Sequence, residues 1–441
     1  MGLNETPSGE RVQIGIFGRT NAGKSSLMNV LTGQQMAVVS DIKGTTTDPV
    51  RKSMELLPIG PVTFIDTPGL DDDSELGEER MKKMEEVLRK VDIALYVLPA
   101  GEDPRESDKE TLLHIKERKI PFLVILNKVD LLEDTDEDLT LVVSKDEQPY
   151  SEAVQEHLLE VGRQLSEDDS GMENGLALTE HELFAMSAHK DAVISANFLR
   201  IRIAQMAEKT EDKRRLVADL MSHGDHMVVV IPIDAAAPKG RLILPEQQVI
   251  RDAIDDGIMV SVVQPEELPL LLHSLKKDPA LVVTDSQAFG AVAEMLPKRV
   301  PLTSFSILMS RYKGDLRTQV SGARKLDTLE DGDMILVCEG CTHHRQCGDI
   351  GTEKLPNWIR AYTKKEFDFT FTSGGEYPDN LEEYKLVIHC GGCTLPKREM
   401  RYRIEEASRQ GVPVTNYGVL IAQMHGILGR VLSPFPSDEL K

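Results

Sequence analysis

Short apolar runs followed by polar loops recur along this chain, and most lead into a helical pattern of apolar residues. In the first half the runs are VQIGIF at 12–17, VTFIDTPG at 62–69 and PFLVILNKVD at 121–130. The second half carries HMVVVIPID at 226–234, IMVSVV at 258–263, ALVVTD at 280–285, DMILVC at 333–338 and YKLVIH at 384–389. Such runs are typical of buried strands, and their alternation with helices predicts parallel sheets with right-handed crossovers. We therefore expect an α/β protein of several domains.

The first apolar run leads into a glycine-rich loop, GRTNAGKS, which is followed by the helical pattern SLMNVL. GxxxxGK[ST] between a strand and a helix predicts a loop whose backbone N–H groups surround phosphates. Lys24 is predicted to reach the β and γ phosphates, and the Ser25 hydroxyl to bind Mg²⁺. A glycine-rich turn that binds no nucleotide is the alternative. The nucleotide-binding candidates here are Gly18, Arg19, Asn21, Ala22, Gly23, Lys24, Ser25 and Ser26.

Three further motifs follow in order, each after an apolar strand. Asp66 is predicted to hold Mg²⁺ through water, and the Gly69 amide to sense the γ-phosphate. A carboxylate such as Asp130 can accept two hydrogen bonds from guanine, which predicts a preference for GTP. The base-contacting candidates are Asn127, Lys128, Asp130, Ser187 and Ala188. Four motifs in series over about residues 11–208 resemble the translation-factor-like GTPases.

The stretch DIKGTTTD at 41–48 lies where the first switch of a GTPase is expected. Thr46 is the predicted contact to Mg²⁺ and the γ-phosphate, with Thr45 and Thr47 as rivals. The predicted catalytic set is therefore Lys24, Thr46, Asp66 and Gly69. Leu70 occupies the position where many GTPases have a glutamine that orients the attacking water.

The loops GRTNAGKSS and GTTTD resemble those of the tRNA-modifying GTPases, which carry GxxNAGKSS and GTTRD. In that group the asparagine at the position of Asn21 helps to bind K⁺, and Thr47 here replaces the arginine of the second loop. The resemblance implies slow, K⁺-stimulated hydrolysis of GTP and a role as a switch.

Charge and composition narrow the possible partners. The 441 residues carry a net charge of −22, which argues against a general binder of nucleic acid. No apolar run approaches the ~20 residues that span a bilayer, and the first residues hold no signal sequence, so we expect a cytoplasmic protein without membrane contact. Residues 131–181 are strongly acidic around a helical pattern near 151–165, which indicates a solvated surface insertion or a docking element for a basic partner.

These patterns divide the chain into three predicted domains. Residues 1–209 form the P-loop GTPase domain with its acidic insertion at 131–181. Residues 210–302 contain three βα units without visible chemistry, which indicates an interaction or oligomerisation domain; Asp234 and Asp285 end strands there and are more typical of helix caps than of ligand sites. Residues 303–441 continue in α/β style.

The last domain holds all five cysteines of the chain, Cys338, Cys341, Cys347, Cys390 and Cys393. They lie at or beyond the carboxyl ends of two predicted strands, the edge that carries binding sites in open parallel sheets. Two CxxC pairs permit structural zinc. If Cys338 points into the core, three cysteines remain, and they would leave one iron of a [4Fe–4S] cluster open to another ligand. His343, His344, His389 and Cys347 are candidates for that ligand or for hydrogen bonds to it.

The arrangement of motifs resembles HydF, a family of scaffold GTPases of [FeFe]-hydrogenase maturation. The resemblance rests on GRTNAGKSS, DTPG, NKVD, TDSQAF, CTHH, VIHCGGC and TNYGVLIAQMHGIL. It implies a GTPase domain, a middle domain for dimerisation, and a last domain with a [4Fe–4S] cluster on Cys341, Cys390 and Cys393, near His343 and His389. It further implies a dimer or larger oligomer. Such a protein receives a diiron precursor made with two radical-SAM maturases and delivers it to apo-hydrogenase.

A second interpretation of the chain's function is also consistent with its residues. The first 208 residues would equally suit a GTPase that acts on the ribosome or tRNA, with a structural zinc module behind it. Metal content separates this reading from the first, because it requires zinc where the first requires iron and sulfide.

Overall fold

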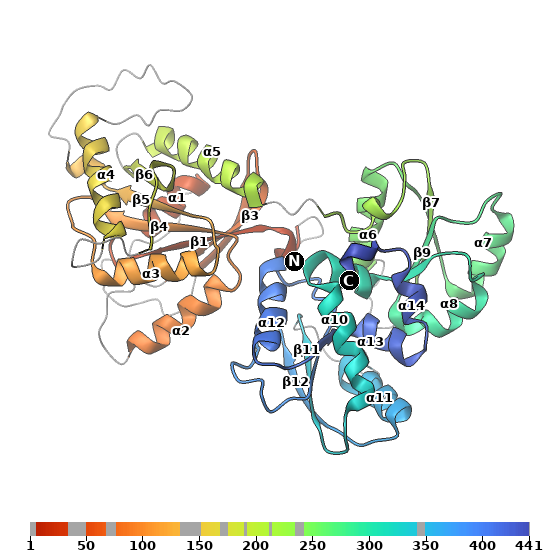
Figure 1. Cartoon of the computed structure of the whole chain (residues 1–441). Helices are drawn as coiled ribbons and strands as arrows, with labels where there is room; N and C mark the ends of the chain where they lie inside the picture. Colours follow the sequence, from red (N-terminus) through yellow and green to blue (C-terminus); the bar gives the residue numbers. More distant parts are fainter. Residues whose placement is uncertain are drawn as a thin grey trace. The chain divides into compact units, whose positions relative to one another are not determined.

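The computed structural model describes residues 6–33, 50–67, 76–132, 151–167, 175–188, 192–210, 214–233, 242–341 and 349–440 (Figure 1). The chain divides into two compact units, Met1–Asp212 and Lys213–Lys441. Across the described ranges, no helix is long and apolar enough to cross a membrane.

The first unit is built on one sheet whose strands lie in the order β2-β3-β1-β4-β5-β6. The strands are β1 (Val12–Gly18), β2 (Val50–Leu56), β3 (Gly60–Asp66), β4 (Ile93–Pro99), β5 (Phe122–Asn127) and β6 (Leu183–Met186). All neighbours are parallel except β2 and β3, which are antiparallel. The predicted buried parallel strands are confirmed, and the antiparallel edge strand β2 is an addition, since its alternating exposed positions gave no apolar run.

Helices cover both faces of this sheet (Figure 1). They are α1 (Lys24–Thr32), α2 (Leu76–Leu88), α3 (Glu106–Glu117), α4 (Glu152–Ser166) and α5 (Ala192–Thr210). Apolar residues of α1 and α5 form one core with the sheet. Residues of α2, α3 and α4 form the other core on the opposite face.

Helix α4 corrects the prediction of a solvated insertion. Its residues Val154, Leu158, Val161 and Leu165 are buried in the core, and Gly162 lies against Leu183 of β6. Their spacing of three and four residues places them on one face of the helix, which outweighs the acidic composition around it. The acidic runs at 133–150 and 168–174 lie outside the described residues.

The second unit contains two parallel sheets. The first has β7 (His226–Val230), β8 (Met259–Val263), β9 (Leu281–Thr284) and β10 (Leu302–Ser304) in the order β10-β9-β7-β8. The second has β11 (Met334–Glu339), β12 (Asp368–Ser373), β13 (Leu386–His389) and β14 (Val414–Asn416) in the order β12-β11-β13-β14. Strand β10 was not predicted, and its three residues are too short for a recognisable apolar run.

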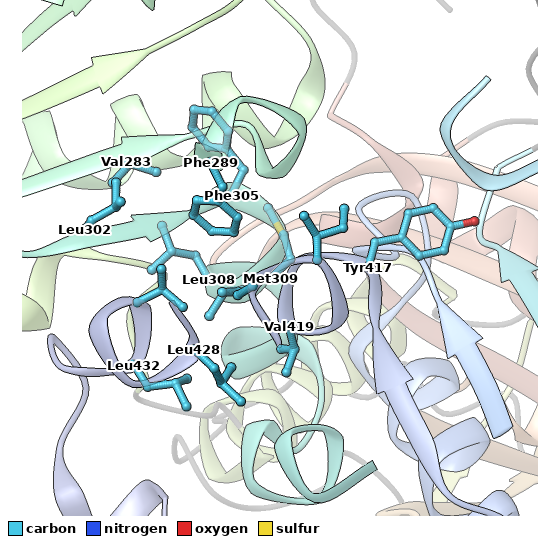
Figure 2. Close-up of a cluster of buried hydrophobic side chains, with 14 of the residues drawn as sticks. Val283, Phe289, Leu302, Phe305, Leu308, Met309, Tyr417, Val419, Leu428 and Leu432 are labelled. Atoms are coloured by element: carbon cyan, nitrogen blue, oxygen red, sulfur yellow. The ribbon is translucent and has the colours of Figure 1, made fainter. Parts of the chain in front are cut away.

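The two sheets of this unit share one apolar core (Figure 2). Phe305, Leu308 and Met309 of helix α9 pack with residues from both sheets' helices, and Tyr417 and Val419 of α13 join them. The predicted boundary between residues 302 and 303 falls inside β10, because α9 belongs to the core of both halves. The helices are α6 (Leu244–Asp255), α7 (Leu268–Ser274), α8 (Phe289–Met295), α9 (Phe305–Lys313), α10 (Leu316–Ala323), α11 (Leu355–Thr363), α12 (Lys397–Arg409), α13 (Tyr417–Met424) and α14 (Leu428–Leu432).

Candidate functional site

The predicted nucleotide motifs meet at one edge of the first sheet. Strands β1, β3, β5 and β6 are parallel there, and each motif begins at the carboxyl end of its strand. The register pairs Ile16 with Asp66, and Asn127 with Met186, which directly precedes Ser187. The topology therefore brings the phosphate, magnesium and base motifs to one edge of the sheet, where open parallel sheets bind their ligands.

The conformation of the phosphate loop is stabilised by its own lysine and depends on two glycines. Lys24 Nζ donates to the carbonyl oxygens of Gly18 at 2.9 Å and Arg19 at 2.7 Å. Gly18 and Gly23 both have positive φ, at 132° and 94°. A Cβ at Gly18 would lie 2.2 Å from Val97 O, and one at Gly23 would lie 2.1 Å from Asn127 Nδ2. Both positions thus require glycine for conformation and for space.

Ser25 and Asp66 form the candidate magnesium site. The Ser25 hydroxyl donates to Asp66 Oδ2 at 2.9 Å, while Asp66 Oδ1 is buried without a hydrogen-bond partner among the described residues. Burial raises the pKa of Asp66, and the hydroxyl of Ser25 and the charges of Lys24 and Lys52 oppose that rise. A buried carboxylate oxygen beside a hydroxyl is the donor set that a hard cation such as Mg²⁺ prefers, so these residues fit the ion.

The base-reading motif is tied to the phosphate loop. Asn127 Nδ2 donates to Ala22 O at 2.9 Å, and Lys128 Nζ donates to Asn21 O at 2.7 Å. Asn127 Oδ1 and Asp130 Oδ1 are buried without hydrogen-bond partners in the described part of the chain. These oxygens can accept from N–H groups of a base. Ser187 is buried and Ala188 half-buried at the adjacent strand end.

The side chain of Arg19 is paired with carboxylates and is therefore not available as a free cation for a bound nucleotide. It is buried in an ion pair with Asp108 of α3 and also contacts Glu102 at 3.1 Å. Only the backbone of Arg19 is therefore available to phosphate. No local sequence pattern predicts this pair, because 89 residues separate its two members.

Several predicted GTPase residues cannot be placed. Thr45, Thr46, Thr47, Gly69 and Leu70 lie outside the described residues, and their roles stay predictions.

The cysteine region is built on strands β11 and β13 of the second unit. Cys338 is paired in register with His389, and the Cys390 N–H donates to Cys338 O at 2.9 Å. Cys341 follows the end of β11, and Cys390 follows the end of β13. The predicted position of both cysteine groups at the carboxyl ends of parallel strands is confirmed.

Alternation along these strands separates the cysteines into two sets. Leu336, Cys338 and Val387 belong to a core on one face of the sheet, whereas Ile388 belongs to the shared core on the other face. Cys390 packs against the shared core, two residues beyond Ile388. Cys338 therefore points into the core, as the sequence analysis considered, and burial raises its pKa to about 11.

His389, which the sequence predicts as a possible additional ligand, lies on the face of Cys338. Its Nε2 accepts from Arg403 Nη1 at 3.1 Å, and its Nδ1 donates to Cys390 O at 3.1 Å. Because a guanidinium only donates and a carbonyl only accepts, both ring nitrogens are engaged and the ring is neutral. Burial and then the charge of Arg403 lower the pKa of His389 to about 3. His343, His344 and Cys347 lie outside the described residues.

Cys341, Cys390 and Cys393 form the candidate cluster site. Burial is the largest cause that raises the pKa of Cys341, followed by the charges of Cys390 and Cys393. Cys390 Sγ accepts N–H hydrogen bonds from Gly340 at 3.0 Å and from Gly392 at 3.3 Å, and burial raises its pKa to about 12 against these bonds. Amides aimed at a sulfur stabilise a thiolate that ligates metal, so the residues fit an iron–sulfur cluster.

The three thiols are not arranged as a finished metal site. Across the described ranges, no three His, Cys, Asp or Glu side chains are positioned to hold a metal ion together. The features that favour a ligand site here are the N–H hydrogen bonds to Cys390 Sγ and the effect of Cys390 and Cys393 on the pKa of Cys341.

Lys313, the last residue of α9, binds the backbone of the loop after β13. Its buried Nζ donates to the carbonyl oxygens of Gly392 at 3.2 Å, Cys393 at 2.8 Å and Leu395 at 2.8 Å. The Thr394 hydroxyl donates to Gly340 O at 2.7 Å and joins the two cysteine loops. The sequence does not predict this role of Lys313, because an isolated lysine at a helix end gives no signal of burial.

Two domain models of one family match the second unit. Residues 216–314 match the hydrogen maturase F dimerization domain, and residues 317–434 match the hydrogen maturase F tetramerization domain. This chain belongs to the hydrogen maturase F (HydF) family. The predicted HydF resemblance is confirmed, and the two matched domains support self-association of the chain.

Residues 13–128 of this HydF-family chain match the 50S ribosome-binding GTPase model, which confirms the predicted P-loop GTPase domain. The chain is 30% identical over 218 residues to the tRNA modification GTPase MnmE of Nitrosomonas europaea, covering 48% of this chain and 46% of that protein. It is 34% identical over 125 residues to the GTPase Era of Ruminiclostridium cellulolyticum, covering 27% of this chain and 40% of that protein. It thus spans less than half the length of these relatives.

Among solved structures, Aquifex aeolicus Era bound to GDP and AlF₄⁻ is 19% identical, with a TM-score of 0.34, and the match covers 64% of this chain and 97% of that one.

Proposed function

We propose that this chain is a GTP-hydrolysing scaffold and carrier of [FeFe]-hydrogenase maturation. It holds a diiron precursor on a [4Fe–4S] cluster and delivers it, in the cytoplasm, to apo-hydrogenase. The observation that carries the proposal is the thiol group of Cys341, Cys390 and Cys393 at adjoining strand ends, in a chain with HydF oligomerisation domains and a GTPase domain.

The GTPase domain supplies the switch. Lys24 and the backbone of the phosphate loop bind the phosphates, and Ser25 with Asp66 holds Mg²⁺, which neutralises charge on the β and γ phosphates. Asp130 selects guanine through its unpartnered carboxylate oxygen. Thr46 and Gly69 complete the site around the γ-phosphate. Asn21 helps to bind K⁺, which stimulates a slow hydrolysis.

The last domain supplies the carrier. Three thiolates ligate the cluster and leave one iron open, where the diiron precursor with its CO and cyanide ligands attaches. The amides of Gly340 and Gly392 stabilise the Cys390 thiolate. His343 and Cys347 are the candidates for a fourth, exchangeable ligand. Radical-SAM maturases are the partners that build the precursor, and apo-hydrogenase is the partner that receives it.

The zinc alternative loses one of its four ligands. It needs Cys338 together with Cys341, Cys390 and Cys393, but Cys338 is fully buried in the core on the other face of the sheet. Structural zinc requires four donors in a tetrahedron, so zinc here would need His343 or Cys347 in place of Cys338, whereas a [4Fe–4S] cluster accepts three thiolates and an exchangeable ligand.

Metal analysis with a matched pair of cysteine variants tests the proposal. The protein is reconstituted anaerobically, its iron, sulfide and zinc are measured, and EPR spectra are recorded after reduction. We expect about four irons per chain and a [4Fe–4S] signal. Cys390→Ala should lose both, whereas Cys338→Ala, which removes a buried thiol on the other face, should keep them. One tight zinc without iron in the wild type would overturn the carrier function.

A further inference from the structure

Tyr417 places a polar group at the boundary between the shared apolar core and the cysteine site. It is the first residue of α13, its ring packs with the core, and the residue is only 7% exposed. Figure 2 shows its hydroxyl pointing away from the labelled apolar side chains. The hydroxyl has no hydrogen-bond partner among the described residues. A buried hydroxyl without a hydrogen-bond partner destabilises the fold, so its presence here calls for a reason.

The surroundings of the hydroxyl are those of the cysteine site. An ideal Cβ on Gly351 would lie 2.3 Å from Tyr417 Oη and 2.4 Å from Glu339 Oε1. Both oxygens therefore lie directly beside Gly351. Glu339 ends β11, two residues before Cys341. Burial raises the pKa of Tyr417 most, and the charges of Cys390 and Glu339 follow as causes. The hydroxyl therefore stays protonated. A hydrogen bond donated to an acceptor in this site would give it the partner that it lacks.

The backbone donors at the start of α13 do not compete for such an acceptor. The Gly418 N–H already donates to Asn416 Oδ1 at 2.8 Å and to Ser306 Oγ at 3.2 Å. Ser306 in turn donates to Asn416 Oδ1 at 2.8 Å. The Gly418 N–H is therefore engaged, whereas the tyrosine hydroxyl is a donor at the start of α13 without an acceptor among the described residues.

We propose that the Tyr417 hydroxyl donates a hydrogen bond to the anionic group held by Cys341, Cys390 and Cys393, and that it is a positioning and tuning residue of that group. This inference rests on the proposed function, because it assumes a cluster on those thiols. Thiolates and sulfides of a cluster are anionic acceptors, and a hydrogen bond to them favours the state with one more electron. Tyr417 thus raises the reduction potential of the cluster.

Tyr417→Phe tests this assignment, since it keeps the ring and removes only the hydroxyl. We expect iron and sulfide content equal to the wild type, a more negative midpoint potential in a redox titration, and altered EPR g-values of the reduced cluster. Tyr377→Phe is the matched control, because Tyr377 is also a buried tyrosine of this unit but donates to Arg403 O on the other face. The control should leave potential and spectrum unchanged.

The possible outcomes separate the inference from the function on which it rests. A Tyr417→Phe protein with full iron and the wild-type potential would overturn the role of the hydroxyl and leave the carrier function standing. A wild type without iron would overturn both. If Tyr417→Phe folds poorly, 3-fluorotyrosine at this position keeps the side chain's shape and strengthens the donor. It should shift the potential in the positive direction, and no shift would again reject the proposal.

Discussion

Arg19, inside the phosphate loop, is bound by its side chain to Asp108 in the first turn of α3. Arg19 Nε lies 3.1 and 2.9 Å from the two carboxylate oxygens, and both side chains are buried. The Tyr96 hydroxyl donates to the same carboxylate at 2.7 Å, as does the Arg105 N–H. The position of the loop therefore depends on a helix that is remote in sequence.

Asp108→Ala should destabilise the GTPase domain. Removing one partner of a buried ion pair leaves an uncompensated charge, which costs about 3–5 kcal/mol. Glu102→Ala is the control, because Glu102 contacts the same arginine but is 53% exposed, and an exposed pair contributes about 0–1 kcal/mol. Urea unfolding followed by circular dichroism measures both. Equal effects of the two substitutions would contradict the structural role of the buried pair.

Lys24→Ala should lower the rate of GTP hydrolysis by about 100-fold or more, since it removes the cation that contacts the transferred phosphate. Iron and sulfide content should be unchanged, because the cysteines of the proposed cluster site lie in the other compact unit. Phosphate release and iron analysis on the same preparation check both expectations. A parallel loss of iron would show that the two units are not independent.

Asp130→Asn should weaken GTP binding by about 100-fold, because the neutral amide replaces a carboxylate that accepts two hydrogen bonds from guanine. The amide N–H of the variant can instead donate to the 2-oxo group of xanthine. We therefore expect XTP to bind the variant better than it binds the wild type, as measured by calorimetry. Unaltered preference for GTP would mean that another residue reads the base.

His389→Ala should destabilise the second unit by about 2–4 kcal/mol without changing iron per folded chain. The substitution creates a cavity and removes the acceptor of Arg403, whereas ligation by His389 would make iron the first loss. His425→Ala serves as control, because His425 is exposed in the same unit. Iron loss in a His389→Ala protein with wild-type stability would restore this histidine as a ligand.

The GTPase motifs were predictable because each is a local pattern. GRTNAGKS, DTPG and NKVD follow apolar strands, and the parallel topology then brings Gly18, Asp66 and Asn127 to one edge. The face of His389 was predictable in principle from strand alternation with Cys338, but its adjacency to Cys390 in sequence suggested a ligand instead.

The remaining features depend on tertiary packing that no local pattern records. Lys313 is a lysine at a helix end, and only the folded chain reveals three carbonyl oxygens around its ammonium. Tyr417 lies in a segment that the HydF resemblance included, yet nothing in the sequence indicates where its hydroxyl points. Helix α4 was obscured by its acidic flanks, although its apolar spacing was visible.

The shared core of the second unit limits where the chain can be divided into fragments that fold. Because α9 and α13 fill the space between both sheets, a fragment that begins near residue 317 would leave the apolar residues of α13 without Phe305, Leu308 and Met309. Such a fragment should collapse without fixed packing and aggregate, however complete its set of cysteines. The cysteine loops and the two matched oligomerisation domains therefore belong to a single folding unit, which has to be expressed as a whole.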